Sequence, residues 1–356
     1  MESSSAGTSM RNAVRWYSFN PTYCKTVILN LGRFMANTNK CKVGGKSDYE
    51  PSLVRVAMEF SKDLGRGGSV VAIVLLVIGL IASAVDANSV EINGVSAVVL
   101  CAAITLGIQL LAWIPASIKQ TEAFFDLTGG VTYVAIVILS LWAGSQSEPP
   151  GERELIVSAL VAIWAIRLSG FLFLRIHRAG KDGRFDELKT SAARFVIPWS
   201  LQALWVFLTL GVVVVINCQE GASPDLGIWD GIGLALWVLG FSIEVTADSQ
   251  KTAFNSDPDN EGKWIAEGLW ARSRHPNYLG EILLWTGVAF FGVSCFEGLE
   301  MVAWVSPVFV YLLLTRISGI TLLDERGLAK WGDDPDYQRY RSETPALIPR
   351  IRGPTE

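Results

Sequence analysis

Eight apolar segments, each close to the length of a helix that crosses a lipid bilayer, follow one another along this chain. They cover residues 69–85, 95–114, 127–143, 154–174, 195–216, 227–247, 278–293 and 301–323. A spanning helix needs about 20 residues, so the first, third and seventh segments are on the short side. Within lipid every backbone group must bond inside its own segment, which favours the α-helix. The sequence therefore predicts an all-α, polytopic transmembrane bundle of about eight spans.

Charge alternates between successive connections. Among Lys and Arg, the first, third, fifth and seventh connections hold only Arg153. The intervening parts hold the Lys and Arg residues: ten in the first 69 residues, six in 175–194, four in 248–277 and seven in the tail from Arg316, while the second connection is neutral, with Lys119 against Glu122. This is the positive-inside pattern, so both termini are expected on the cytosolic-type side. The basic face of the membrane domain suits anionic lipid headgroups and equally a phosphorylated cofactor.

Composition bounds the class of protein. Half of the 356 residues are hydrophobic and 18% are charged, which is too apolar for a soluble domain of this length. We expect a basic arm over residues 1–65, either a transit peptide or a disordered tail, and a membrane domain over 66–350. The membrane would be that of the endoplasmic reticulum or of a plastid or mitochondrion. With two histidines and five scattered cysteines, we predict neither a metal site nor disulfides, and no nucleic acid partner.

Ionisable residues occur where lipid is expected, and they need a physical reason. The polar residues inside or at the ends of the apolar segments are Asp126, Arg167, Glu244, Asp248, Asn277, Glu281 and Arg316. A charge at the centre of a spanning helix costs roughly 2.5–3.5 kcal/mol on insertion scales. They could be paired ions that hold the bundle together, Arg167 with Asp126 or Glu244 and Arg316 with Glu281. Alternatively, they line a shared polar cavity that opens to the basic face.

The densest polar cluster stands immediately before the seventh apolar segment. Arg274, His275, Asn277 and Tyr278 surround Pro276, which suits the first turn of a helix because its missing N–H is not needed there. Free N–H groups at such a helix start can bind an anionic oxygen. Solvated polar groups in an interfacial loop are the simpler interpretation, but this density favours a ligand site.

Several segments together match a known pattern. They are residues 164–168, 180–184, 244–254, 268–270, 273–281, 324–326 and 330–332. In these the chain resembles the steroid 5-alpha-reductase-like membrane proteins, most closely their broad and poorly characterised branch. That branch belongs to a superfamily with sterol C14 and C7 reductases and isoprenylcysteine methyltransferases. The resemblance covers roughly residues 100–350.

The resemblance implies an NADPH site. Asn277 and Glu281 fall where the reductases hold the nicotinamide, and Lys251 occupies a position that faces cofactor phosphate in the sterol reductases. One departure is Asn255, which stands where an arginine is expected. The implied cofactor-binding residues are Glu244, Asp248, Lys251, Trp270, Arg274, Asn277, Tyr278, Glu281, Arg316, Asp324 and Tyr340.

The resemblance also implies a catalytic group. Asp126 falls where the steroid enzymes place an acidic residue against the substrate carbonyl, and their partner tyrosine is replaced here by Trp164. The leading hypothesis is NADPH-dependent reduction of a C=C bond conjugated to a carbonyl in a lipophilic substrate. Asp126, in protonated form, or Arg167 would stabilise charge on the carbonyl oxygen. Solvent would supply the proton for the α-carbon.

Two other functions fit parts of the pattern. The run from Arg274 to Tyr278 and the tail 344–349 also resemble membrane enzymes that methylate with S-adenosylmethionine. Retention of Glu244, Asp248 and Lys251 favours the reductase, because Lys251 suits an extra phosphate. A non-catalytic lipid-binding membrane protein with a decayed site is the third possibility.

Overall fold

A computed structural model describes the backbone of residues 50–349, with side chains from residue 61 onward except Ala179. Residues 1–49, most of the expected basic arm, lie outside this range. The chain divides into two compact units, Met1–Ala57 and Met58–Glu356, and the helical bundle belongs to the second. The long helices are α2 (Glu50–Ala84), α3 (Ala97–Lys119), α4 (Phe125–Gly144), α5 (Glu152–Ala179), α6 (Ala192–Cys218) and α7 (Ile228–Ser256).

Shorter elements complete the fold. The pair β1 (Glu91–Ile92) and β2 (Val95–Ser96) forms a small antiparallel hairpin, and three 3-10 turns lie in loops: η1 (Gly183–Phe185), η2 (Pro258–Asn260) and η3 (Gly268–Ala271). The C-terminal third contains α8 (Pro276–Phe290), η4 (Gly298–Trp304), α9 (Val305–Leu312), the π-helical η5 (Leu313–Ile317), α10 (Ile320–Trp331) and α11 (Pro335–Glu343). The predicted all-α bundle is confirmed over the described residues.

Seven described segments are long and apolar enough to cross a membrane: six helices up to α7, and the run Gly298–Trp331. This is a multi-pass membrane protein. The remaining predicted span, 278–293, is helix α8, which has 15 residues. At 1.5 Å per residue it covers about 22 Å, less than a hydrocarbon core of about 30 Å. Pro276 stands at its start, as the sequence predicted.

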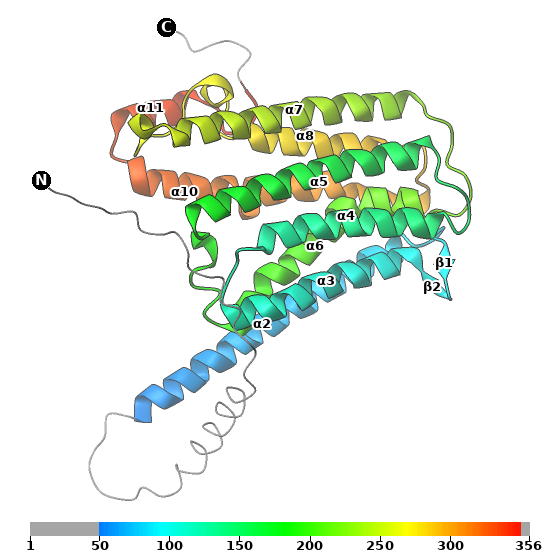
Figure 1. Cartoon of the computed structure of the whole chain (residues 1–356), viewed down its shortest axis with the longest axis horizontal. Coiled ribbons are helices and arrows are strands. Elements are labelled where there is room, and N and C mark those ends of the chain that lie inside the picture. The colour runs from blue at the N-terminus through cyan, green and yellow to red at the C-terminus, as the bar shows by residue number, and fades with distance from the viewer. Residues whose placement is uncertain (1–49, 350–356) are drawn as a thin grey trace, which may run out of the picture. The chain divides into compact units, whose positions relative to one another are not determined.

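The connections gather at two ends of the bundle according to their charge. Gln219 pairs with Ser89 and donates to the Cys295 carbonyl, so three acidic connections meet beside the β1–β2 hairpin. At the other end, Glu122 accepts hydrogen bonds from the loop between α5 and α6. Figure 1 shows the hairpin and α10–α11 at opposite ends. The chain therefore crosses the bundle from one end to the other in each long helix and again in α8. This agrees with the alternation of charge between successive connections.

Helices α7 and α8 pack with their backbones in contact because glycines face each other. A Cβ atom on Gly240 would lie 2.5 Å from the Gly280 carbonyl oxygen, and one on Gly287 would lie 2.5 Å from the Gly233 carbonyl oxygen. Small residues at such spacing let membrane helices approach closely. Gly280 also meets the backbone of Glu244, where its Cβ would lie 2.6 Å from the amide nitrogen. The close approach brings the polar residues at the basic end of both helices together.

Candidate functional site

A cavity of about 270 Å³ opens at the basic end, between α7, the η3 loop and the C-terminal helices; we call it the basic cavity. Lys251, Lys263, Arg274, Arg326 and Lys330 supply five cations to its lining, against the single carboxylate of Asp324. Its other polar and aromatic lining residues include Asn255, Trp264, Trp270, His275, Trp331, Tyr337 and Tyr340. The cavity therefore suits an anionic group attached to a flat ring system.

Trp270 organises one wall of the basic cavity. Its indole N–H donates to the Ala247 carbonyl at 3.0 Å, which fixes η3 against α7. Its own carbonyl accepts a hydrogen bond from the Tyr340 hydroxyl at 2.8 Å, which attaches α11 to the same wall. The Lys251 ammonium lies 4.5 Å from the centre of the Trp270 ring, a cation–π contact. Lys251 is thus held by an aromatic ring rather than by an opposite charge.

The opposite wall is anchored by Asp324. Arg274 donates to one of its carboxylate oxygens at 2.7 Å, and Arg341 lies 3.4 Å from the other. The His275 ring lies 3.7 Å from the same carboxylate and stacks on Tyr278. Burial lowers the pKa of His275 below its ordinary value, and the nearby Asp324 only partly opposes this. His275 is therefore a neutral ring at physiological pH.

The C-terminal segment closes the basic cavity from outside. The backbone N–H of Arg274 donates to the Pro345 carbonyl at 2.9 Å, and the Ser273 hydroxyl donates to the Leu347 carbonyl at 2.7 Å. Asp334 starts α11 by accepting from the backbone of Asp336, with a proline at the first helical position. The tail is thus a structural part of the site.

An acid cluster lies deeper, between α5, α7 and α8. Arg167 donates to Glu244 at 2.8 Å and pairs with Asp248 at 2.8 Å. Trp164 donates its indole N–H to the other Glu244 oxygen at 3.2 Å, and Asn277 lies 3.4 Å from Asp248. Glu244 and Asp248 are buried, at 2% and 7% exposure. Of the two partners considered for Arg167 from the sequence, Asp126 and Glu244, the structure pairs it with Glu244, and Asp248 is a further partner.

Glu281 is the third carboxylate of the acid cluster. It follows Asn277 by one turn of α8, and its charge interacts with those of Glu244 and Asp248. Glu281 is half-buried, yet it forms no hydrogen bond or ion pair with any residue that the structure describes. Arg167 pairs with two of the three carboxyl groups, and Glu281 is the one without a bonded partner among the described residues.

A second cavity, of about 100 Å³, begins on the other side of Trp164; we call it the apolar cavity. Its walls are mostly apolar and come from α4, α5 and α6. Asp126 lies at one end of it, and the Asp126 Oδ2 atom is buried without a hydrogen bond. Trp164 lines this cavity with its ring and bonds the acid cluster with its N–H, so the two sites share one wall.

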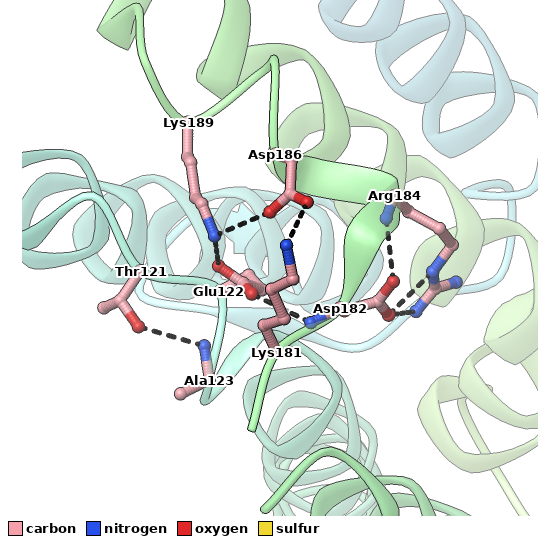
Figure 2. A network of polar contacts seen from close by, with 8 residues as sticks. All are labelled: Thr121, Glu122, Ala123, Lys181, Asp182, Arg184, Asp186 and Lys189. Atoms are coloured by element: carbon pink, nitrogen blue, oxygen red, sulfur yellow. Dashed lines mark hydrogen bonds and ion pairs between the residues drawn. The ribbon is translucent and has the colours of Figure 1, made fainter. Parts of the chain in front are cut away.

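The loop between α5 and α6 holds Arg184 at the mouth of the apolar cavity. Asp182 binds the Arg184 guanidinium at 2.6 Å, and Glu122 receives the Asp182 backbone N–H at 2.9 Å and the Lys189 ammonium at 2.8 Å (Figure 2). Arg184 then lies 3.7 Å from Asp126. Burial acts to raise the pKa of Glu122, but the hydrogen bonds from Lys189 and Asp182 outweigh it and hold this pKa below its ordinary value.

Residues 112–344, which include both cavities and the acid cluster, match one family, described as a protein of unknown function. The chain belongs to the DUF1295 family. It is also 25% identical over 234 residues to an uncharacterized protein of Schizosaccharomyces pombe. That match covers 57% of this chain and 65% of the yeast protein, so it spans less than two thirds of the relative's length.

Most residues predicted for the site come together in this DUF1295 protein. Five of them line the basic cavity: Lys251, Trp270, Arg274, Asp324 and Tyr340. Trp164, Arg167, Glu244, Asp248 and Asn277 form the acid cluster, with Glu281 beside it. Asp126 lies in the apolar cavity, and Tyr278 packs on His275.

Arg316 is the exception among the predicted residues. It lies on the π-helical η5, its side chain is exposed, and it pairs with no acidic group among the described residues. The pairing of Arg316 with Glu281, considered from the sequence, does not occur. A π-helical turn inserts one residue into the helix and rotates the residues after it, which a regular helical wheel does not anticipate.

Four residues that the structure brings to the site were not predicted from the sequence. Tyr133, Ser169, Gln202 and Trp205 line the apolar cavity. Gln202 carried a signal, because it is a polar side chain inside the apolar run 195–216, and such residues are candidates for function.

Proposed function

We propose that this DUF1295 protein is a membrane oxidoreductase that uses NADPH to reduce a C=C bond conjugated to a carbonyl in a lipophilic substrate. The observation that supports it best is the adjacency of two unlike cavities. A basic, aromatic cavity lies on one side of the α7–α8 acid cluster, and an apolar cavity with one carboxyl group lies on the other. The seven-residue step from Glu244 to Lys251 on α7 corresponds to about 10 Å.

The basic cavity fits a phosphorylated nucleotide. Lys251 and Arg274 present cations from two walls, with Lys263 and Lys330 at the rim, and Trp270 and Trp264 offer flat surfaces. A lysine held over an indole ring keeps its ammonium free to meet a phosphate oxygen. S-adenosylmethionine carries no phosphate, so this lining favours NADPH over the methyltransferase alternative.

The acid cluster fits the chemistry of a nicotinamide ring. NADPH, if bound here, would supply the hydride, and a carboxylate beside its ring would favour the positive charge of the oxidised form. Glu281 offers a carboxylate that no described residue neutralises, and Asn277 offers an amide beside it. Fixed charges aimed at developing charge of opposite sign lower a reaction barrier. Glu244 and Asp248 are held rigidly by Arg167, which orients the cluster.

The apolar cavity would take the reacting end of the substrate. Its aliphatic and aromatic walls exclude water, and Asp126 stands where a carbonyl oxygen could receive a hydrogen bond from its protonated carboxyl. The hydride joins the β-carbon, a proton from solvent joins the α-carbon, and the C=C bond becomes a single bond. Arg184, paired with Asp182, lies close enough to Asp126 to share in stabilising the oxygen.

The first test is the identity of the nucleotide. Purified protein in detergent is titrated with NADPH and, separately, with S-adenosylmethionine, by calorimetry. We expect NADPH to bind and Lys251→Met to weaken it roughly 10–100-fold, the effect of removing one charge-assisted hydrogen bond. Lys119→Met, at an exposed lysine that ends α3, is the matched control. Binding of S-adenosylmethionine alone would indicate a methyltransferase instead of a reductase. Binding of neither ligand would favour a non-catalytic lipid-binding protein.

A further inference from the structure

Gln202 on α6 stands apart from the other polar residues of the apolar cavity because its side-chain amide is unused. Its Oε1 atom is buried without a hydrogen bond. Neither atom of the amide bonds to any residue that the structure describes. A buried acceptor without a partner costs roughly 1–3 kcal/mol, so this oxygen needs a reason.

The neighbouring hydroxyl protons are already committed. The Thr209 hydroxyl donates to the Trp205 carbonyl at 2.7 Å, so the Tyr133 hydroxyl, 2.5 Å from Thr209, is the donor in that pair. The Ser169 hydroxyl donates to the Ala165 carbonyl at 2.7 Å. Neither Tyr133 nor Ser169 therefore has a proton left for a ligand in the cavity, whereas Gln202 has two.

Two adjacent glycines on α4 make room for polar side chains of other helices, Gly129 for the Gln202 amide and Gly130 for Ser169. A Cβ atom on Gly129 would lie 2.7 Å from Gln202 Nε2, and one on Gly130 would overlap the Ser169 hydroxyl. Both glycines follow Asp126 within about one helical turn and line the same cavity. In the segment from Asp126 to Gly130, Asp126 therefore supplies a carboxyl group, and the glycines after it leave space for an amide from another helix to approach that group.

We propose that Gln202 is a second group that binds the substrate oxygen, opposite Asp126. The ligand it selects is a lipophilic ketone or enone with its carbonyl oxygen between Asp126 and Gln202. The amide can turn about its last side-chain bond without losing any hydrogen bond, and this directs its N–H toward the oxygen. Two donors from different helices, Asp126 in protonated form and Gln202, then meet on one oxygen as in an oxyanion hole.

This inference rests on the proposed function for the role of the oxygen, but it can be tested without turnover or NADPH. Purified full-length protein is titrated with cholest-4-en-3-one and with cholest-4-ene, which differ only at the carbonyl. Binding is followed by the fluorescence of tryptophans, two of which, Trp164 and Trp205, line the cavity. We expect the ketone to bind at least about tenfold more tightly, because a polar site left unpaired rejects the hydrocarbon.

Gln202→Met should reduce this preference about tenfold while leaving the affinity for cholest-4-ene unchanged. Gln146→Met, at an exposed glutamine near the opposite end of the bundle, should leave the preference intact. If Gln202→Met fails to fold, Gly129→Ala serves as the second variant, because its added Cβ displaces the amide while alanine favours the helix. It should also reduce the preference.

The outcomes separate the two proposals. A wild-type protein that binds both ligands equally, or a Gln202→Met protein with its preference intact, overturns the role of Gln202 even if NADPH binds. If the preference for the ketone depends on Gln202 but the protein never binds NADPH, the oxygen-binding site is supported and the proposed reductase activity is refuted.

Discussion

Two arginines that pair with acids, the buried Arg153 and the half-buried Arg167, have opposite surroundings. Arg153 is 1% exposed and makes four hydrogen bonds: two to the Asp230 carboxylate, and one each to the Pro224 and Asp225 carbonyls. Its charge and its donors are matched within the protein. Arg167 pairs with Glu244 and Asp248, while Glu281, the third carboxyl group of the cluster, has no bonded partner among the described residues.

This difference separates residues that stabilise the fold from residues that bind ligands. Removing one partner of a closed buried pair strands the other charge, so closed pairs contribute mainly to stability. A cluster with an unmatched carboxylate beside two cavities holds electrostatic free energy that a ligand of opposite charge can release. We therefore expect substitutions at the acidic end to affect folding and those at the basic end to affect binding and turnover.

The largest expected effect is on turnover at the open site. Asp126→Asn should lower the rate of enone reduction roughly 10²–10⁴-fold, because the amide cannot provide the acidic proton. NADPH affinity, measured by calorimetry, should be unchanged, since Asp126 lies in the other cavity. Glu148→Gln, at an exposed acid beyond α4, is the control. Loss of NADPH binding in Asp126→Asn would contradict the separation of the two cavities.

The next effect is on stability at the closed site. Arg153→Met should destabilise the protein by about 3–5 kcal/mol, because Asp230 would remain buried without its partner. Unfolding in detergent, followed by circular dichroism, measures the loss, and Arg178→Met at an exposed arginine of α5 is the control. NADPH affinity per folded molecule should stay the same. A stable Arg153→Met protein with weakened NADPH binding would contradict the assignment of Arg153 to stability and of the basic end to binding.

A smaller effect tests the support of the acid cluster. Gly240→Ala should cost about 1–3 kcal/mol, because its Cβ would overlap the Gly280 carbonyl and force α7 and α8 apart. It should also weaken NADPH binding, because Asn277 lies on α8 and moves with that helix. Gly231→Ala, on the same helix and with nothing near its added Cβ, should be neutral or slightly stabilising. Equal melting temperatures for both variants would mean that backbone contact does not hold the two helices.

The smallest effect concerns the loop that carries Arg184. Glu122→Gln should cost about 1 kcal/mol at neutral pH, as expected for a partly exposed ion pair with Lys189. Because the pKa of Glu122 lies below its ordinary value of 4.5, its contribution is present above about pH 4.5 and disappears as the pH falls through the folded value. The stability difference between wild type and Glu122→Gln should therefore shrink in acid. Glu187→Gln, at an exposed acid of the same loop, is the control, and a difference that grows in acid would contradict the assignment.

The bundle was predictable from sequence because hydropathy and loop charge report directly on membrane crossing. The prediction differs from the structure in extent at α8, which has 15 residues, and in regularity over 301–323, where η4, α9, η5 and α10 follow one another. Lys251, Arg274 and Asp324 were predicted from the family resemblance, and they line one cavity although they stand on three separate segments of the chain. Their binding of NADPH stays a prediction, which the nucleotide titration tests.

Other features depend on pairings between distant segments, which no local pattern reveals. The Arg153–Asp230 pair joins the first turns of α5 and α7, and the two residues are 77 positions apart in sequence. Gln202 gains its place only through the glycines of α4, and its amide contributes nothing to the periodicity of α6. The partner of Arg167 was ambiguous for the same reason, since Asp126 and Glu244 approach α5 from different helices.

The attachment of the tail to Ser273 and Arg274 has a consequence for biosynthesis. The wall of the basic cavity depends on Tyr340 and on the carbonyls of Pro345 and Leu347, which leave the ribosome after every membrane-crossing helix. Helices can thus be inserted into the bilayer long before a nucleotide pocket exists. A nascent chain stalled before residue 337 would be anchored in its membrane and yet unable to hold its ligand.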